Sequence, residues 1–218
     1  YLARHQVLQR EVAIKVLPQS LAMSPPAKQR FLDEARALAR VRHENIVHIH
    51  RVLDHSEMLA FEMELVDGPS LQEVVQAQRH QGKPHSLESL AAALDLPANA
   101  LGARTTVEWT VRLGIRIARA LAEVHRFGLV HRDVKPSNIL LRADGRPVLA
   151  DFGLARDDDA ATAGALAQSN AFAGTAVYAA PERLRAGGAG LDGRADVYSL
   201  GVTLCECLTQ KAPYPGHT

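Results

Sequence analysis

The chain carries at residues 131–138 the sequence His131-Arg132-Asp133-Val134-Lys135-Pro136-Ser137-Asn138, and Asp151-Phe152-Gly153 follows downstream. Both segments mix charged and amide side chains with proline or glycine, which is typical of loops rather than of helix or strand interiors. Their carboxylates and amide are the groups that acid–base chemistry and hard metal ions use. The chemistry of the chain is therefore expected here, and the fold has to bring these two loops together.

Upstream of these loops the sequence predicts a small sheet with one helix. The run Val12-Ala13-Ile14-Lys15-Val16-Leu17 ends at Pro18 and is typical of a strand that one lysine interrupts. Ser24-Pro25-Pro26 marks a helix start, and apolar residues at helical spacing extend the helix to near Arg42. Two more strands are predicted over Ile46–Val52 and Met58–Val66, before the turn at Asp67-Gly68-Pro69.

The rest of the chain is predicted to be mainly helical. Ser70–Glu73 and Thr105–Glu108 match the capping-box pattern, so a helix should begin at each. The second helix, to about Arg126, is apolar on more than one face and is expected to be buried, and Gly128 closes it. A last apolar helix is predicted over Val197–Leu208. Residues 80–104 are rich in Ala, Pro and Gly, include a helical stretch over Leu87–Leu94, and are interpreted as a surface insertion.

Composition sets limits on function. The 218 residues are 47% apolar, and 25 Lys and Arg nearly cancel 24 Asp and Glu, so charge does not favour a nucleic-acid or membrane-surface partner. Cys205 and Cys207 lie two apart in a predicted helix, cannot readily pair, and indicate a reducing compartment. No apolar run approaches the roughly 18 residues of a membrane span. A cytoplasmic location is expected, although a larger parent could carry an anchor elsewhere.

In order and spacing, these loops, the upstream Val12-Ala13-Ile14-Lys15 and the downstream Ala180-Pro181-Glu182 resemble the signature set of protein kinases, and the chain looks closest to bacterial kinases of eukaryotic type. The resemblance implies an α+β, two-lobed fold. Residues 1–66 would form the N-lobe, a small antiparallel sheet with one helix, and residues 67–218 a mainly helical C-lobe with 80–104 as an insertion. The family's glycine-rich loop and last C-lobe helices have no counterpart, so we expect a kinase domain incomplete at both ends.

The resemblance assigns the catalytic residues. Asp133 would be the base that accepts the proton of the attacking hydroxyl, and Lys135 would hold the γ-phosphate of ATP. Asn138 and Asp151 would bind Mg²⁺ through hard oxygen atoms. Asp196 matches a buried aspartate that supports the catalytic loop through backbone donors.

It also assigns a nucleotide site. Lys15 would contact the α- and β-phosphates and pair with Glu34 on the following helix. Met63 would lie behind the adenine, with the backbone of Glu64 and Val66 as its hydrogen-bond partners. The apolar residues that enclose the adenine ring match Ala13 and Leu140, and those of a stacked spine between the lobes match Leu38, Ile49, His131 and Phe152.

The implied function is transfer of the γ-phosphate of Mg-ATP to serine or threonine hydroxyls of protein substrates, expected of the parent enzyme more than of this fragment. Lys135 and Gly174-Thr175 favour the serine/threonine branch. Arg132 beside the base predicts self-phosphorylation at Thr162 or Ser169, unless Asp157-Asp158-Asp159 already fill the basic pocket. The alternatives are a pseudokinase scaffold and a small-molecule phosphotransferase of related fold. The G-x-G-x-x-G match at 188–193 and a zinc site at His43, His48, His50 and His55 are both disfavoured.

Overall fold

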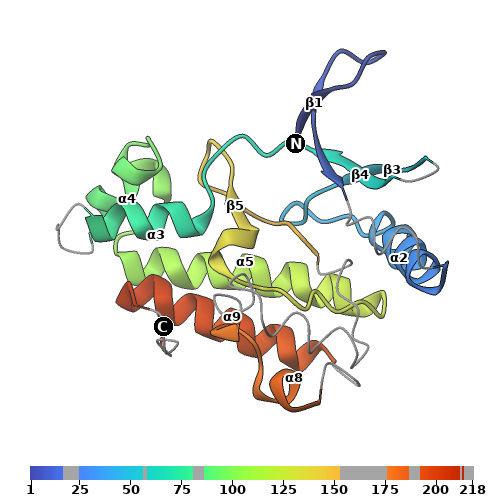
Figure 1. Ribbon diagram of the computed structural model, residues 1–218. Coiled ribbons are helices and arrows are strands. Elements are labelled where there is room, and N and C mark those ends of the chain that lie inside the picture. Colours follow the sequence, from blue (N-terminus) through green and yellow to red (C-terminus); the bar gives the residue numbers. More distant parts are fainter. Residues whose placement is uncertain are drawn as a thin grey trace.

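The computed structural model describes residues 1–16, 25–55, 58–80, 86–152, 176–186, 192–211 and 213. They form an α+β molecule with two lobes, a sheet with one helix above a group of helices (Figure 1). The four-stranded antiparallel sheet has the order β1-β2-β4-β3 and consists of β1 (Leu2–Arg4), β2 (Glu11–Val16), β3 (Ile49–His55) and β4 (Met58–Glu64), accompanied by helix α2 (Pro25–Leu38).

The helical lobe holds α3 (Leu71–His80), α4 (Leu87–Ala93), α5 (Thr106–Arg126), α8 (Pro181–Ala186) and α9 (Gly193–Thr209). It also carries the 3-10 turns η1 (Ala98–Leu101) and η2 (Pro136–Asn138) and a hairpin of β5 (Ile139–Leu141) with β6 (Pro147–Leu149). Helices α5 and α9 lie side by side through this lobe (Figure 1). None of the helices in the described ranges is long and apolar enough to cross a membrane.

The segment before β3 differs from its prediction. The strand expected over Ile46–Val52 instead begins at Ile49. Ile46 bridges to Leu149 of β6, and Val47 N donates to Leu149 O at 2.9 Å. Leu149 N in turn donates to Asn45 O at 2.8 Å. The apolar run is therefore divided between the two lobes, because its first residues pair with the C-lobe hairpin before the chain enters the N-lobe sheet.

Helix α2 is also shorter than predicted, since it ends at Leu38 rather than near Arg42. Arg40 N and Val41 N donate to carbonyls three residues back, at 3.1 and 3.0 Å, which tightens the chain into a turn. The turn directs residues 43–47 toward the C-lobe. The apolar face of α2 is buried as the spacing predicts, and the rings of Phe31 and Phe61 stack with centroids 4.4 Å apart.

Both predicted helix starts in the C-lobe are correct. Before α3, Ser70 N donates to Glu73 Oε2 at 2.7 Å and Glu73 N donates to Ser70 Oγ at 3.2 Å, which closes the capping box. At α5 the side chain of Thr105 accepts from Glu108 N at 3.1 Å. The capping-box pattern predicts that the Glu108 carboxylate accepts from the backbone N–H of Thr105. It accepts instead from the backbone N–H of the preceding residue, Arg104, at 2.8 Å.

The core corrects two expectations drawn from composition. Leu113, Ile117 and Leu121 bury one face of α5, but Val111 and Ile115 are 52% and 47% exposed, so the prediction of burial on several faces is wrong for that side. Within residues 80–104, Leu90 and Leu94 of the α4 segment join the buried cluster of the helical lobe. That segment is thus part of the core as well as of the surface.

Gly68 at the turn between the lobes yields a stability prediction. A Cβ at this residue would lie 1.8 Å from the carbonyl oxygen of Leu141, whereas a Cβ at Gly201 in α9 would meet nothing within 4 Å. We expect Gly68→Ala to lower the free energy of unfolding by about 3 kcal/mol, because backbone has to move. Gly201→Ala should raise it by about 0.5–1 kcal/mol, because alanine favours helix. Urea denaturation measures both, and equal effects would contradict the assigned backbone contact.

Candidate active site

The β5–β6 hairpin brings the two predicted loops together. Ile139 pairs with Leu149, and Ala150 N donates to the carbonyl of Asn138 at 2.8 Å. Asn138 directly precedes β5 and Asp151 follows β6 by two residues, so antiparallel pairing places both at the same end of the hairpin. Asp151 has a φ of +57°, a left-handed backbone conformation that is costly for a non-glycine residue.

Asp196 fixes the loop that carries Asp133. Its side chain is 1% exposed, and its Oδ2 and Oδ1 accept from the backbone N–H groups of His131 and Arg132, each at 2.8 Å. His125 Nε2 lies 2.8 Å from the same Oδ2. The predicted support of the catalytic loop by Asp196 is therefore confirmed.

His131 connects this loop to the residue after Asp151. Its ring is fully buried, its Nε2 donates to the carbonyl of Ala150 at 3.0 Å, and its Nδ1 accepts from Asp133 N at 3.2 Å. Burial lowers the pKa of the imidazole, so the ring is neutral with its proton on Nε2. It packs on Phe152 at 4.4 Å between ring centroids, and Phe152 shares the inter-lobe core with Leu38 and Ile49. The structure thus brings the four residues of the predicted spine together.

Asp133 lies between a cation and an amide. Lys135 Nζ is 3.0 Å from its Oδ2, and Asn138 Nδ2 donates to that oxygen at 2.9 Å and to the Asp133 carbonyl at 2.8 Å. Because the amide nitrogen of Asn138 faces Asp133, its Oδ1 faces the other way and accepts from Ser137 Oγ at 3.3 Å. The three predicted catalytic residues therefore form one cluster.

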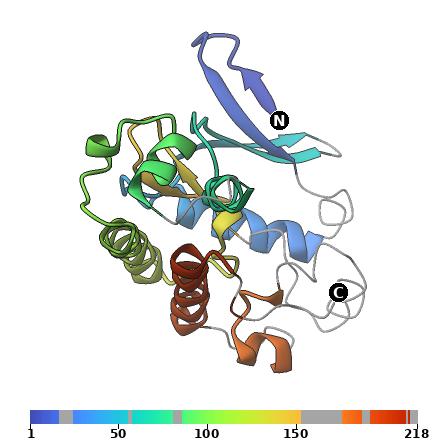
Figure 2. The same ribbon diagram turned by 90° about the vertical axis from the view of Figure 1, so that its left-hand side faces the viewer.

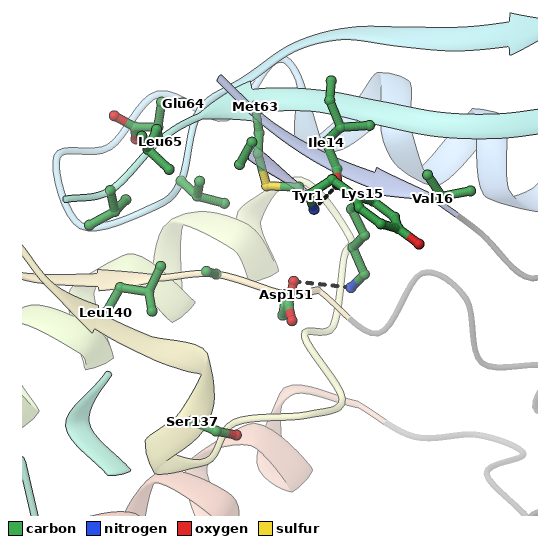
Figure 3. A pocket seen from close by; sticks show the side chains of 14 residues that line it. Tyr1, Ile14, Lys15, Val16, Met63, Glu64, Leu65, Ser137, Leu140 and Asp151 are labelled. Carbon is green, nitrogen blue, oxygen red and sulfur yellow. Dashed lines mark hydrogen bonds and ion pairs between the residues drawn. The ribbon is translucent and has the colours of Figure 1, made fainter. Parts of the chain in front are cut away.

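A pocket of about 410 Å³ opens beside this cluster, between the lobes (Figure 3). Of the eight residues predicted to bind nucleotide, all but Glu34 line it: Ala13, Lys15, Met63, Glu64, Val66, Leu140 and Asp151. The volume falls in the usual range for small-molecule sites, roughly 300–1,000 Å³. Lys15 and Asp151 point toward each other across the pocket, with Nζ and Oδ1 3.2 Å apart (Figure 3).

The ion pairs differ from the prediction that Lys15 pairs with Glu34. Lys15 pairs with Asp151, and Glu34 Oε1 lies 3.5 Å from Arg132 Nη1. Each of the two residues thus has another charged partner in this structure. All four side chains are between 24% and 52% exposed, so neither contact carries the cost of breaking a fully buried pair.

Sequence reasoning missed a tether at the base of the pocket. Arg142 Nη2 lies 2.9 Å from Glu64 Oε2, and Glu64 Oε1 accepts from the backbone N–H of His48 at 2.9 Å. The tether links the end of β4 to the C-lobe and to the segment before β3. No local pattern marks Arg142, because its partner is 78 residues away in the chain.

The buried carboxylate of Glu206 holds the segment before Ala180-Pro181-Glu182. Tyr178 Oη donates to Glu206, which is also bound by Arg79 Nη2 at 2.7 Å. Burial, reinforced by the Glu206 carboxylate, raises the pKa of Tyr178 and keeps the phenol protonated. Ser199 Oγ donates to the Tyr178 carbonyl at 2.8 Å. This segment is therefore fixed to α9.

The predictions on Gly153, Asp157–Asp159, Thr162, Ser169 and Gly174-Thr175 lie outside the described residues.

Replacing Asp196 tests the support of the catalytic loop. We expect Asp196→Asn to lower the free energy of unfolding by about 2–3 kcal/mol, because an amide has one acceptor oxygen for two backbone donors and turns its own N–H₂ toward the other. Thermal or urea denaturation measures the loss. Asp33→Asn on the exposed side of α2 is the control and should change stability by less than about 0.5 kcal/mol. Similar effects at both positions would contradict the role of Asp196.

Comparison with known proteins identifies the family of the chain. The protein kinase domain model matches residues 1–218. The chain is 38% identical to the serine/threonine-protein kinase PkaA of Streptomyces coelicolor over 94% of the chain and 33% of that protein. It is 36% identical to PknL of Mycobacterium tuberculosis, over 96% of the chain and 45% of PknL. The crystal structure of the M. tuberculosis PknI kinase domain superposes with a TM-score of 0.68 at 27% identity, covering 100% of the chain and 71% of that domain. The chain spans a third to a half of these two curated relatives, and it belongs to the protein kinase family.

Proposed function

We propose that the protein containing this chain is a serine/threonine protein kinase that transfers the γ-phosphoryl group of ATP to protein hydroxyls. The observation that carries the proposal is the position of Asp133. Its carboxylate is held by Lys135 and Asn138 beside a pocket that Lys15 and Asp151 line. Lys15, Asp151 and Ser137 line a cavity large enough for a nucleotide, and the base Asp133 belongs to the loop that carries Ser137.

Asp133 accepts the hydrogen bond of the attacking hydroxyl and takes its proton late in the transfer. The contact with Asn138 orients the carboxylate, and that with Lys135 places a positive charge beside the point of attack. In this role Lys135 holds the γ-phosphate while the hydroxyl is bound by Asp133. The loop stays in place because Asp196 accepts from two of its backbone N–H groups.

The nucleotide is bound by the residues that line the pocket. Ala13 and Leu140 enclose the adenine, Met63 lies behind it, and the backbone of Glu64 and Val66 forms its hydrogen bonds; all five residues line the pocket. This is the arrangement expected of a site that recognises an aromatic base with apolar walls and a few polar groups.

Asn138 and Asp151 suit a hard divalent cation, for which we propose Mg²⁺. The Oδ1 of Asn138 faces away from Asp133, and the Asp151 carboxylate is about half exposed toward the pocket. When bound, the ion would neutralise charge on the phosphate oxygens. Lys15, which also lines the pocket, adds a positive charge beside Asp151.

The proposal extends to the substrates and to the limits of the domain. Lys135 and Gly174-Thr175 favour serine and threonine acceptors by resemblance, and self-phosphorylation at Thr162 or Ser169 belongs to the same proposal. Residues 1–66 and 67–218 would be the two lobes, with 80–104 as an insertion. A pseudokinase scaffold is disfavoured because Lys15, Glu34, Asp133, Asn138 and Asp151 are all present.

The decisive test is Asp133→Asn in the full-length protein. We expect phosphate incorporation into a serine- and threonine-containing peptide library to fall by about 100-fold or more, because the amide cannot take a proton. Affinity for ATP should stay within about twofold, since Asp133 acts on the hydroxyl. The exposed Asp67→Asn is the control. Activity of the Asp133 variant within about tenfold of wild type, roughly 1.4 kcal/mol of barrier, would contradict the assigned base.

A second test concerns the exchange of ion pairs on nucleotide binding. We propose that Lys15 leaves Asp151 and pairs with Glu34 when ATP and its metal ion occupy the pocket. In a double-mutant cycle with Lys15→Met and Glu34→Gln, the loss of transfer rate should therefore be far from additive. The same cycle with Asp33→Asn in place of Glu34→Gln should be additive. Additive losses in both cycles would mean that Lys15 and Glu34 do not act together.

A further inference from the structure

A second pocket of about 270 Å³ lies on the helical lobe, away from the nucleotide site. It is formed by the end of η1, the first half of α5 and the turn between β5 and β6, and shares no lining residue with the first pocket. Asp144, Gly145 and Arg146 occupy that turn, so the pocket lies at the end of the hairpin opposite to Asn138 and Asp151. The neighbouring helix α4 lies at the left of Figure 1 and faces the viewer in Figure 2.

The segment 80–104, to which the kinase resemblance gives no role, builds one wall of this pocket. Ala100, Leu101 and Gly102 belong to it. A Cβ at Gly145 would lie 3.4 Å from Leu96 Cδ1, and one at Gly102 would lie 3.6 Å from Arg112 Nη1, both at ordinary van der Waals distance. The segment therefore lies directly beside α5 and the hairpin turn.

The pocket combines an apolar floor with arginine side chains. Trp109 and Leu113 are buried at 7% and 3% exposure, and Leu101 packs against the same core cluster. The charged lining consists of three arginines, Arg112, Arg116 and Arg146, and one carboxylate, Asp144.

Two of the arginines are engaged within the protein. Arg112 Nη2 lies 2.7 Å from Glu108 and Arg146 Nε lies 2.6 Å from Asp144. The side chain of Arg116 is exposed and makes no ion pair or hydrogen bond with any residue in the described ranges. Its guanidinium is therefore available to an external anion, directly beside the apolar floor.

The size of the pocket suits the side chains of a peptide. Its volume of about 270 Å³ is smaller than the roughly 300–1,000 Å³ of sites that enclose a whole small molecule. One or two side chains fit it, and a carboxylate next to a large apolar residue would complement both the cation and the floor.

We propose that this pocket docks a segment of the protein substrate in which an acidic residue adjoins a leucine-like residue. The acidic side chain binds Arg116, and the apolar side chain packs on Trp109 and Leu113. Docking tethers the substrate to the enzyme and so raises the effective concentration of its acceptor hydroxyl at the catalytic cluster. This role rests on the proposed kinase function, whereas the binding event itself does not.

Binding is measured first, on the full-length protein, by fluorescence anisotropy with the labelled probe peptide Glu-Leu-Glu-Leu-Glu-Leu. Arg116→Glu should weaken binding by about tenfold or more, because it turns attraction into repulsion. The matched control is Arg119→Glu, which changes an exposed arginine of the same helix that does not line the pocket and should leave the affinity within about twofold. Arg112 is a poorer choice because its pair with Glu108 belongs to the helix start.

Two peptide controls separate docking from simple anion binding. A probe with lysine in place of glutamate should not bind, and one with serine in place of leucine should bind at least about tenfold more weakly, because it leaves the apolar floor uncovered. Equal binding of the serine probe, or equal loss with Arg116→Glu and Arg119→Glu, would overturn the proposal.

The functional arm compares an acceptor peptide with the same peptide fused to the probe sequence. The fused peptide should have a KM about tenfold lower with the wild-type protein, and Arg116→Glu should remove that advantage. If the probe binds at Arg116 but neither peptide is phosphorylated, the kinase proposal fails and the site stands. If both are phosphorylated with equal KM in the wild type, the substrate-docking proposal fails and the kinase function stands.

Discussion

The active site depends on one buried carboxylate. Asp196 accepts the backbone N–H groups of His131 and Arg132, in the loop that follows α5, each at 2.8 Å. Leaving such buried donors unpaired would cost about 1–3 kcal/mol each, so Asp196 stabilises the conformation of the loop. Arg132, at a φ of +66°, is held in a backbone conformation that is costly for a non-glycine residue. Asp133 is the next residue, so the hydrogen bonds to Asp196 also help to fix its position.

The charges around the pocket form a balanced set. Lys15, Arg132 and Lys135 face Asp151, Glu34 and Asp133, and each cation lies within 3.5 Å of one of the carboxylates. The two pairs at Lys15 and Arg132 are partly exposed, and pairs of this kind contribute little to stability on their own. They can therefore exchange at low cost when an anionic ligand adds charge. The pair of Lys135 with Asp133 is more buried, which suits a group whose position has to stay fixed.

Local patterns predicted the elements that local interactions stabilise. The strand around Lys15 follows from its apolar run, and the starts of α3 and α5 follow from capping residues close in the sequence. The catalytic loop is assigned from its resemblance to the kinase signature, and its conformation depends on the distant Asp196. The errors arise where contacts with residues far away in the sequence determine pairing or burial. Ile46 and Val47 look like strand residues, yet their partner is β6 of the other lobe. Val111 and Ile115 look like core residues, but the described part of the chain leaves them exposed. The Arg142–Glu64 tether and the present partner of Lys15 depend on how the lobes meet, which no spacing encodes.

The crossing of residues 45–47 into the C-lobe hairpin has a consequence for the modularity of the domain. Because Asn45 and Val47 exchange backbone hydrogen bonds with Leu149, the ladder of the hairpin continues into the chain of the N-lobe. Asn45 Nδ2 adds a bond to the Pro147 carbonyl at 2.6 Å. Cutting the chain at the turn after β4 would strip these groups of their partners in both halves. The two lobes are therefore not separable folding units, and exchanging one lobe between relatives would require residues 45–47 to be exchanged together with β6.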